Sequence, residues 1–277
     1  MTPDEYCKDK AASSGSSFYY SFLFLPPGRR RAITALYAFC REVDDVVDET
    51  EDQLVARTKL AWWRNELANL FAGKPQHPVT RALEPALQPF GITEARLNDI
   101  IDGMQMDLDQ SRYLDFVGLE KYCYRVAGVV GLLAAGIFGY RNAGTLEYAK
   151  NLGLAFQLTN IIRDVGDDAR RNRIYLPMDE LKRFEVPASD ILNAKYSDNF
   201  TRLMHFQSGR AESYYAKALA ALPDEDRRDQ RAGLIMAAIY RSVLEEIASD
   251  GFKVLTQRTS LTPMRKLSIA VRTWLRT

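Results

Sequence analysis

The chain has 277 residues, of which 47% are apolar and 26% charged, and its formal net charge is +1. This apolar content is enough for a large core and excludes a disordered chain. The basic residues are not interleaved with aromatics, which gives little support to nucleic-acid binding, and no such partner is expected. No linker composition divides the sequence, and we expect a single domain over residues 1–277.

The cysteines, Cys7, Cys40 and Cys123, are odd in number and form no CxxC motif. Reduced thiols in a cytoplasmic protein fit this pattern best. Acidic residues interrupt the first ten positions, where a signal peptide would need an apolar stretch. The longest uncharged run, 126–140, is shorter than the ~20 residues of a membrane-spanning helix, and we expect it to be a buried helix.

In chain order, the pattern predicts helices separated by proline, glycine and polar residues. A short N-terminal helix precedes a serine-rich loop at 13–17, and Pro26-Pro27-Gly28 begins the first long helix. Asp52 and Thr93 are the expected N-caps of the helices over 52–71 and 93–108. Further helices are expected over 78–89, 119–138, 142–165, 197–222 and 225–250, followed by a basic tail over 252–277. No strand pattern of useful length occurs, so the expected fold class is all-α.

The predicted helix over 119–138 carries three glycines, Gly128, Gly131 and Gly136. A glycine inside a helix costs up to ~1 kcal/mol relative to alanine. These glycines therefore indicate either the close approach of another backbone or room left for a ligand. The segment 122–131 is by default a core helix, and the alternative is a cavity wall with a tyrosine hydroxyl in an apolar slot.

One face of the first long helix combines charge with apolar surroundings. At about 100° per residue, Tyr37, Arg41, Asp44 and Asp48 fall inside an arc of roughly 60°. Such a face is costly to bury without a ligand. A divalent cation together with a phosphate-bearing molecule would be a suitable ligand.

A second stretch repeats this spacing. Gln157, Asn160, Asp164 and Asp168 share one helix face, and three of them have the offsets of Tyr37, Asp44 and Asp48. Each face alone could be solvated. Two such faces in one helical chain favour two walls of one cavity, where Mg²⁺ would be held by carboxylates and completed by phosphate oxygens and water.

Other candidates are weaker when taken singly. The Ser16-Ser17-Phe18 segment is typical of a helix-capping loop, and its hydroxyls could also donate to a diphosphate. Arg173, Tyr175, Tyr240 and Arg258 could equally be surface charges and ordinary aromatic packing.

Three segments together resemble one known family. They are 37–48, 124–131 and 160–168, the last with the following Arg173-Ile174-Tyr175-Leu176-Pro177. The sequence resembles the head-to-head prenyl synthases, which include squalene, dehydrosqualene and phytoene synthases, from Ser16 to about Arg258. Ser14-Gly15 stands where many phytoene synthases carry His-Ser. The segments 14–22 and 39–48 resemble those of the bacterial presqualene diphosphate synthases of hopanoid biosynthesis, and the Ser14-Gly15 departure favours the same type.

The resemblance implies a helical isoprenoid-synthase bundle around a central cavity, and it implies roles for individual residues. It gives a metal-binding role, with two or three Mg²⁺ ions, to Asp44, Asp48, Asn160, Asp164 and Asp168. It places near the substrate Ser17, Phe18, Tyr37, Arg41, Gln157, Tyr175, Tyr240 and Arg258. It places Tyr124 near the reacting carbons. The catalytic set is then Arg41, Asp44, Tyr124 and Asp164.

The implied reaction joins two molecules of farnesyl diphosphate into presqualene diphosphate and releases diphosphate. NADPH is not expected for this product. The proton acceptor could be Tyr124 or the released diphosphate. Dehydrosqualene, squalene or phytoene synthesis is the alternative within the family, and a non-enzymatic helical scaffold is the alternative outside it. Further expectations are peripheral contact of the basic tail with the inner membrane and contact with downstream hopanoid-pathway enzymes.

Overall fold

The computed structural model describes residues 1–13, 21–22, 24–50 and 52–277. These residues form helices and no strand apart from an isolated bridge between Arg112 and Ile174, which confirms the all-α prediction. The elements are α1 Pro3–Ser13, α3 Pro27–Asp48, α4 Gln53–Phe71, α5 Pro78–Leu83, η1 Glu84–Ala86, α6 Leu87–Phe90, α7 Glu94–Asp109, α8 Phe116–Cys123, the π-helical η2 Tyr124–Gly128, α9 Val129–Phe138, α10 Gly144–Arg163, α11 Val165–Arg170, α12 Met178–Arg183, α13 Ala188–Leu192, α14 Asp198–Ala221, η3 Asp224–Asp226, α15 Arg231–Ser249 and α16 Pro263–Arg276.

Local chemistry sets several helix starts. The Asp52 side chain accepts a hydrogen bond from the Leu54 amide at 2.7 Å, and Thr93 accepts one from Arg96 at 3.4 Å. Both N-cap predictions are therefore confirmed. The predicted helix over 78–89 is instead divided into α5, η1 and α6, because Pro85 and Pro89 lack the amide that a continuous helix needs.

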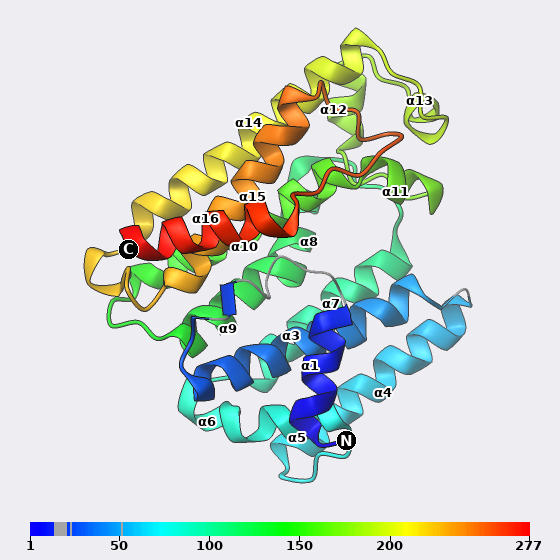
Figure 1. Cartoon of the computed structure of the whole chain (residues 1–277). Coiled ribbons are helices and arrows are strands. Elements are labelled where there is room, and N and C mark those ends of the chain that lie inside the picture. The colour runs from blue at the N-terminus through cyan, green and yellow to red at the C-terminus, as the bar shows by residue number, and fades with distance from the viewer. Residues whose placement is uncertain (14–20, 23, 51) are drawn as a thin grey trace.

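The bundle has two halves, which Figure 1 shows with α3, α4 and α7 in one and α10, α14 and α15 in the other. In the first half α3 packs against α1, α5 and α7, and in the second α10 packs against α14 and α15. The segment α8–η2–α9 contacts helices of both halves. The buried apolar side chains form one continuous core cluster.

Glycines bring the backbones of η2 and α9 into contact with that of α10. A Cβ added to Gly131 would lie 2.3 Å from the Ala149 carbonyl oxygen, and one on Gly153 would lie 2.3 Å from that of Ala127. Close backbone approach is thus confirmed for Gly131. Within the described part of the chain, Phe116–Phe138 is the one stretch whose length and composition would allow it to cross a bilayer. It contacts α10 along this glycine seam, as expected for a core helix.

Candidate active site

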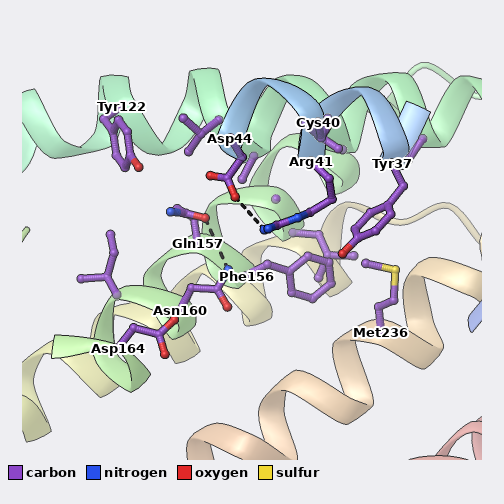
Figure 2. A pocket seen from close by; sticks show the side chains of 18 of the residues that line it. Tyr37, Cys40, Arg41, Asp44, Tyr122, Phe156, Gln157, Asn160, Asp164 and Met236 are labelled. Atoms are coloured by element: carbon purple, nitrogen blue, oxygen red, sulfur yellow. Dashed lines mark hydrogen bonds and ion pairs between the residues drawn. The ribbon is translucent and has the colours of Figure 1, made fainter. Parts of the chain in front are cut away.

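A cavity with a volume of about 670 Å³ lies between the two halves of the bundle. Its walls come from α3, α7, α9, α10, α11 and α15, as Figure 2 shows for part of it. Charged side chains gather in one part of the cavity, where they pair with one another. The remainder is apolar, with Ile33, Val130, Phe138 and Leu152 among its lining residues. The predicted central cavity is confirmed.

Helix α3 supplies the first wall. Tyr37, Arg41, Asp44 and Asp48 all line the cavity, as their helical spacing predicts. Arg41 donates hydrogen bonds to Asp44 at 2.6 Å and to Asp45 at 2.5 Å. Asp48 lies one turn further on. It forms ion pairs with Arg171 at 2.7 Å and with Arg173 at 3.0 Å, both from the opposite side of the cavity.

The end of α10 and the start of α11 supply the second wall. Gln157, Asn160, Asp164 and Asp168 line the cavity, but the predicted continuous helix is broken at Asp164. The Asp168 amide still bonds to the Asp164 carbonyl at 2.8 Å, which preserves the offset of the two carboxylates. The break is held by Gly166, whose amide bonds to Val254 at 3.1 Å and whose added Cβ would lie 2.3 Å from the Leu255 carbonyl oxygen.

This docking brings two arginines onto Asp164. Arg163 donates to both carboxylate oxygens, at 2.8 and 2.5 Å, and Arg258 adds a hydrogen bond at 2.8 Å. Burial alone would raise the pKa of Asp164, but the hydrogen bonds and charges of Arg163 and Arg258 hold it below its ordinary value. Asp164 therefore stays ionised, and the arginines add positive charge to the cavity.

Asp107 on α7 also lines the cavity, although the sequence analysis did not single it out. Its two carboxylate oxygens accept hydrogen bonds from Tyr175 at 2.7 Å and from Tyr122 at 2.9 Å. Asp107 lies three residues after Met104 and seven after Ile100, on the apolar face of α7. An acidic residue in that register was the signal that could have identified it.

Comparisons with known proteins agree with this geometry. The family model for squalene/phytoene synthases matches residues 11–265. The chain belongs to the squalene/phytoene synthase family. It is 35% identical over 284 residues to a 15-cis-phytoene synthase of Synechocystis sp., covering 98% of this chain and 84% of that one. It is 37% identical over 279 residues to a phytoene synthase of Arthrospira platensis, covering 95% and 89%.

Solved structures of squalene/phytoene synthases show the same fold. A dehydrosqualene synthase in complex with ligand superposes with a TM-score of 0.87 at 29% identity, covering 99% of this chain and 96% of that one. The squalene synthase HpnC from Alicyclobacillus acidocaldarius gives a TM-score of 0.78 at 26% identity, covering 90% and 94%. The isoprenoid-synthase fold expected from the sequence is thereby confirmed.

In this member of the family, three carboxyl groups in the cavity resist ionisation. Burial, reinforced by Asp48, raises the pKa of Asp44 to about 7. Burial, reinforced by Asp164, raises the pKa of Asp168 to about 8, and burial raises that of Asp107 to about 6. Crowded carboxylates with raised pKa values are stabilised by an added cation, which removes their mutual repulsion.

The donor set fits Mg²⁺ shared with a phosphate. The Asn160 Oδ1 atom is buried and has no hydrogen-bond partner among the residues that the structure describes. Within the same residues, no three His, Cys, Asp or Glu side chains converge closely enough to hold a metal ion by themselves. Mg²⁺ commonly takes one or two carboxylates and completes its octahedron with water and substrate phosphates. Asp44, Asp48, Asn160, Asp164 and Asp168 offer such partial ligation from two walls.

Tyr124 lies outside the cavity lining, and its role near the reacting carbons stays a prediction. This side chain is 37% exposed and is not among the cavity-lining residues, whereas Tyr122 lines the cavity. Two residues apart on a helix means about 200° of rotation, so only one of these tyrosines can face Asp107. The Tyr124 ring instead lies over Gly128, where an added Cβ would come within 2.9 Å of it.

The other predicted substrate contacts divide into two groups. Tyr37, Arg41, Gln157, Tyr175 and Arg258 line the cavity. Tyr240 does not: its ring packs against Phe156, with centroids 4.8 Å apart, and Phe156 is the residue that faces the cavity. Tyr240 also interacts with Arg163, which lines the cavity, and its contact with the substrate stays a prediction. Ser17 and Phe18 lie outside the described residues.

The apolar part of the cavity contains a buried hydroxyl group without a partner. Tyr148, on α10, lines this part and is 1% exposed, and among the described residues its hydroxyl has no hydrogen-bond partner. A Cβ on Gly233 would lie 2.5 Å from the Tyr148 oxygen, so α15 confines it. Tyr215 is equally buried, but its hydroxyl shares a hydrogen bond of 2.9 Å with Thr159.

We expect Tyr148→Phe to stabilise the protein by about 1 kcal/mol, because it removes a buried, unsatisfied hydroxyl. Tyr215→Phe is the matched control and is expected to destabilise the protein by about 1 kcal/mol, because it breaks a buried hydrogen bond. Urea unfolding of both variants and the parent measures the difference. Equal free energies of unfolding for the two variants would contradict the assignment of Tyr148 as unsatisfied.

Proposed function

We propose that this protein catalyses the Mg²⁺-dependent head-to-head condensation of two geranylgeranyl diphosphates to phytoene. The observation that carries the proposal is one cavity in which a part rich in carboxylates and arginines opens directly into an apolar part. An allylic diphosphate has this division between a charged head and an apolar tail. The choice of the longer substrate is supported by the two phytoene synthase relatives, at 35% and 37% identity over nearly the whole chain.

Each part of the cavity then has a task. Arg41, Arg173 and Arg258 would bind and orient the diphosphates, and Mg²⁺, when bound, would neutralise charge on the departing one. Tyr37 and Phe156 line the cavity, and their aromatic faces would stabilise an allylic cation. The apolar walls would exclude water from this cation.

The released diphosphate is the proton acceptor that we favour. The sequence left a choice between it and Tyr124, and Tyr124 is not among the lining residues. Both Tyr122 and Tyr175 already donate hydrogen bonds to Asp107, and burial raises the pKa of each well above its ordinary value. A phenol in that state is a poor base.

Presqualene diphosphate formation from two farnesyl diphosphates is the second candidate. It was the preferred product from the sequence, and the structural match to a dehydrosqualene synthase supports a shorter substrate. The comparisons favour the phytoene alternative over it. The non-enzymatic scaffold has less support, because both acidic walls line one cavity.

Product analysis tests the proposal. With Mg²⁺ and no NADPH, we expect phytoene from geranylgeranyl diphosphate, and kcat/KM for this substrate at least about tenfold above that for farnesyl diphosphate, because a pocket that fits the longer tail gains apolar contact. Presqualene diphosphate as the main product would favour the second candidate. Squalene formed only with NADPH would overturn both. If neither substrate released diphosphate in the presence of Mg²⁺, the non-enzymatic scaffold would become the favoured hypothesis.

A further inference from the structure

The C-terminal helix α16 lies in the basic tail for which membrane contact is expected from charge alone, and it also has an apolar face turned to solvent. Ala270 is buried against the rest of the molecule, and Ile269 is half-buried. On the opposite side, Met264 is 84% exposed and Leu275 71% exposed. At about 100° per residue, the exposed apolar residues of α16 form a stripe within an arc of roughly 100°. The stripe consists of Met264, Leu267, Val271, Trp274 and Leu275.

A row of arginines borders this stripe. Arg265, Arg272 and Arg276 fall within an arc of roughly 40°, between the stripe and the packed side of α16. Arg265 pairs with Glu246 at 2.5 Å, and no acidic partner of Arg272 or Arg276 occurs among the described residues. The sequence from Phe252 to Thr277 contains no acidic residue. The exposed side of α16 therefore combines apolar surface with uncompensated positive charge.

The stripe lies beside the cavity. Trp274 stacks on Phe24 with ring centroids 5.7 Å apart, and Phe22, two residues earlier, lines the apolar part of the cavity. Near the other end of α16, burial and the charges of Arg163 and Arg258 lower the pKa of Lys266, and both arginines line the charged part. Figure 1 shows α16 in red, lying across the outside of the bundle.

We propose that α16 docks this protein on the surface of an anionic lipid bilayer. A helix with an apolar stripe flanked by arginines lies in the plane of the interface, with the stripe among the acyl chains and the arginines at anionic head groups. A second copy of the chain is the less suitable partner. An isologous contact through the stripe would bring both arginine rows into one interface, where they would repel.

Co-sedimentation with vesicles tests the proposal. We expect the protein to bind vesicles of mixed phosphatidylglycerol and phosphatidylcholine, and to bind pure phosphatidylcholine vesicles much more weakly. Leu267→Glu/Leu275→Glu should lower the partition coefficient by on the order of a hundredfold, because each buried leucine contributes about tenfold. Arg272→Gln/Arg276→Gln should lower it by about twenty-five-fold, because each arginine near the surface contributes roughly fivefold. Added salt should also weaken binding, because it screens the arginines from the head groups.

Leu114→Glu is the matched control, because Leu114 is 81% exposed on another part of the surface. It should bind like the parent, and thermal unfolding should show all variants folded. Failure of the parent to bind anionic vesicles would overturn the proposal, as would equal binding by the leucine double variant. A dimer in solution that the leucine double variant abolishes would identify a second copy as the partner instead. The experiment measures vesicle binding and not turnover, so its outcome does not depend on the proposed reaction.

Discussion

Asp168→Asn is expected to reduce Mg²⁺-dependent diphosphate release by about a thousandfold, which is the scale of losing one charge-stabilising group in an active site. The same substitution is expected to raise the melting temperature of the metal-free protein above about pH 8. Asparagine has nearly the shape of aspartate, so packing is kept while the charge that attracts the cation is removed. Activity and stability would therefore change in opposite directions.

The sign of the stability change follows from the raised pKa. Burial and Asp164 raise the pKa of Asp168 from 3.8 to about 8, so the folded state binds a proton more tightly than the unfolded state. The free energy of unfolding of the metal-free parent falls as pH rises between these two values, and the loss is complete above the folded pKa. The asparagine side chain of the variant cannot ionise, so its free energy of unfolding does not fall through this titration. The difference between variant and parent should vanish below about pH 4.

Thermal unfolding of both proteins in EDTA across this pH range measures the effect. Asp102→Asn is the matched control, because Asp102 pairs with Arg64 at 2.6 Å and does not line the cavity. This control should keep its activity. An Asp168→Asn variant that released diphosphate at the parental rate would remove Asp168 from the cation site, and unchanged stability at high pH would contradict the crowded-carboxylate account.

The two acidic walls could be predicted because helix geometry fixes the angle between residues three, four and seven apart. Tyr37, Arg41 and Asp44 lie on one face in any α-helix, so no tertiary information was needed. The caps of α4 and α7 were equally local, since Asp52 and Thr93 bond to amides two or three residues away.

Contacts between residues far apart in the sequence could not be predicted from helix geometry. The break at Asp164 depends on Gly166 meeting the backbone at Val254 and Leu255, and the same contact brings Arg258 to Asp164. Nothing in the local sequence around Asp164 specifies a partner so distant along the chain.

For a related reason, helical periodicity cannot show which of Tyr122 and Tyr124 lines the cavity. The π-helical segment Tyr124–Gly128 interrupts α8–α9, and its rotation is set by packing against α7 and α10. Gly103 on α7 marks this contact, because its added Cβ would lie 2.6 Å from the Val126 side chain. Periodicity fixes which residues share a face, and tertiary packing decides which face meets the cavity.

Arg41 forms the ion pair that keeps the first wall partly ionised. It donates to Asp44 at 2.6 Å and to Asp45 at 2.5 Å. Burial and Asp48 raise the pKa of Asp44 to about 7, and Arg41 opposes this rise. Asp45 does not line the cavity. It also forms an ion pair with Lys10 at 2.8 Å, so it remains paired when Arg41 is replaced. Asp44 has no second cation within salt-bridge distance among the described residues.

Arg41→Gln should therefore lower kcat by about a hundredfold, because it removes a positive charge from the departing diphosphate. It should also move the acid limb of the kcat–pH profile upward, because Asp44 without Arg41 holds its proton to a higher pH. Arg64→Gln is the matched control: its pair with Asp102 has similar exposure but lies away from the cavity, and such pairs contribute at most about 1 kcal/mol. Steady-state kinetics from about pH 6 to pH 9 at limiting and at saturating Mg²⁺ would separate the two effects, because Mg²⁺ competes with the proton for Asp44 and should suppress the pH shift but not the loss of rate. A parental rate with an unshifted profile would show that Arg41 acts on neither the diphosphate nor Asp44.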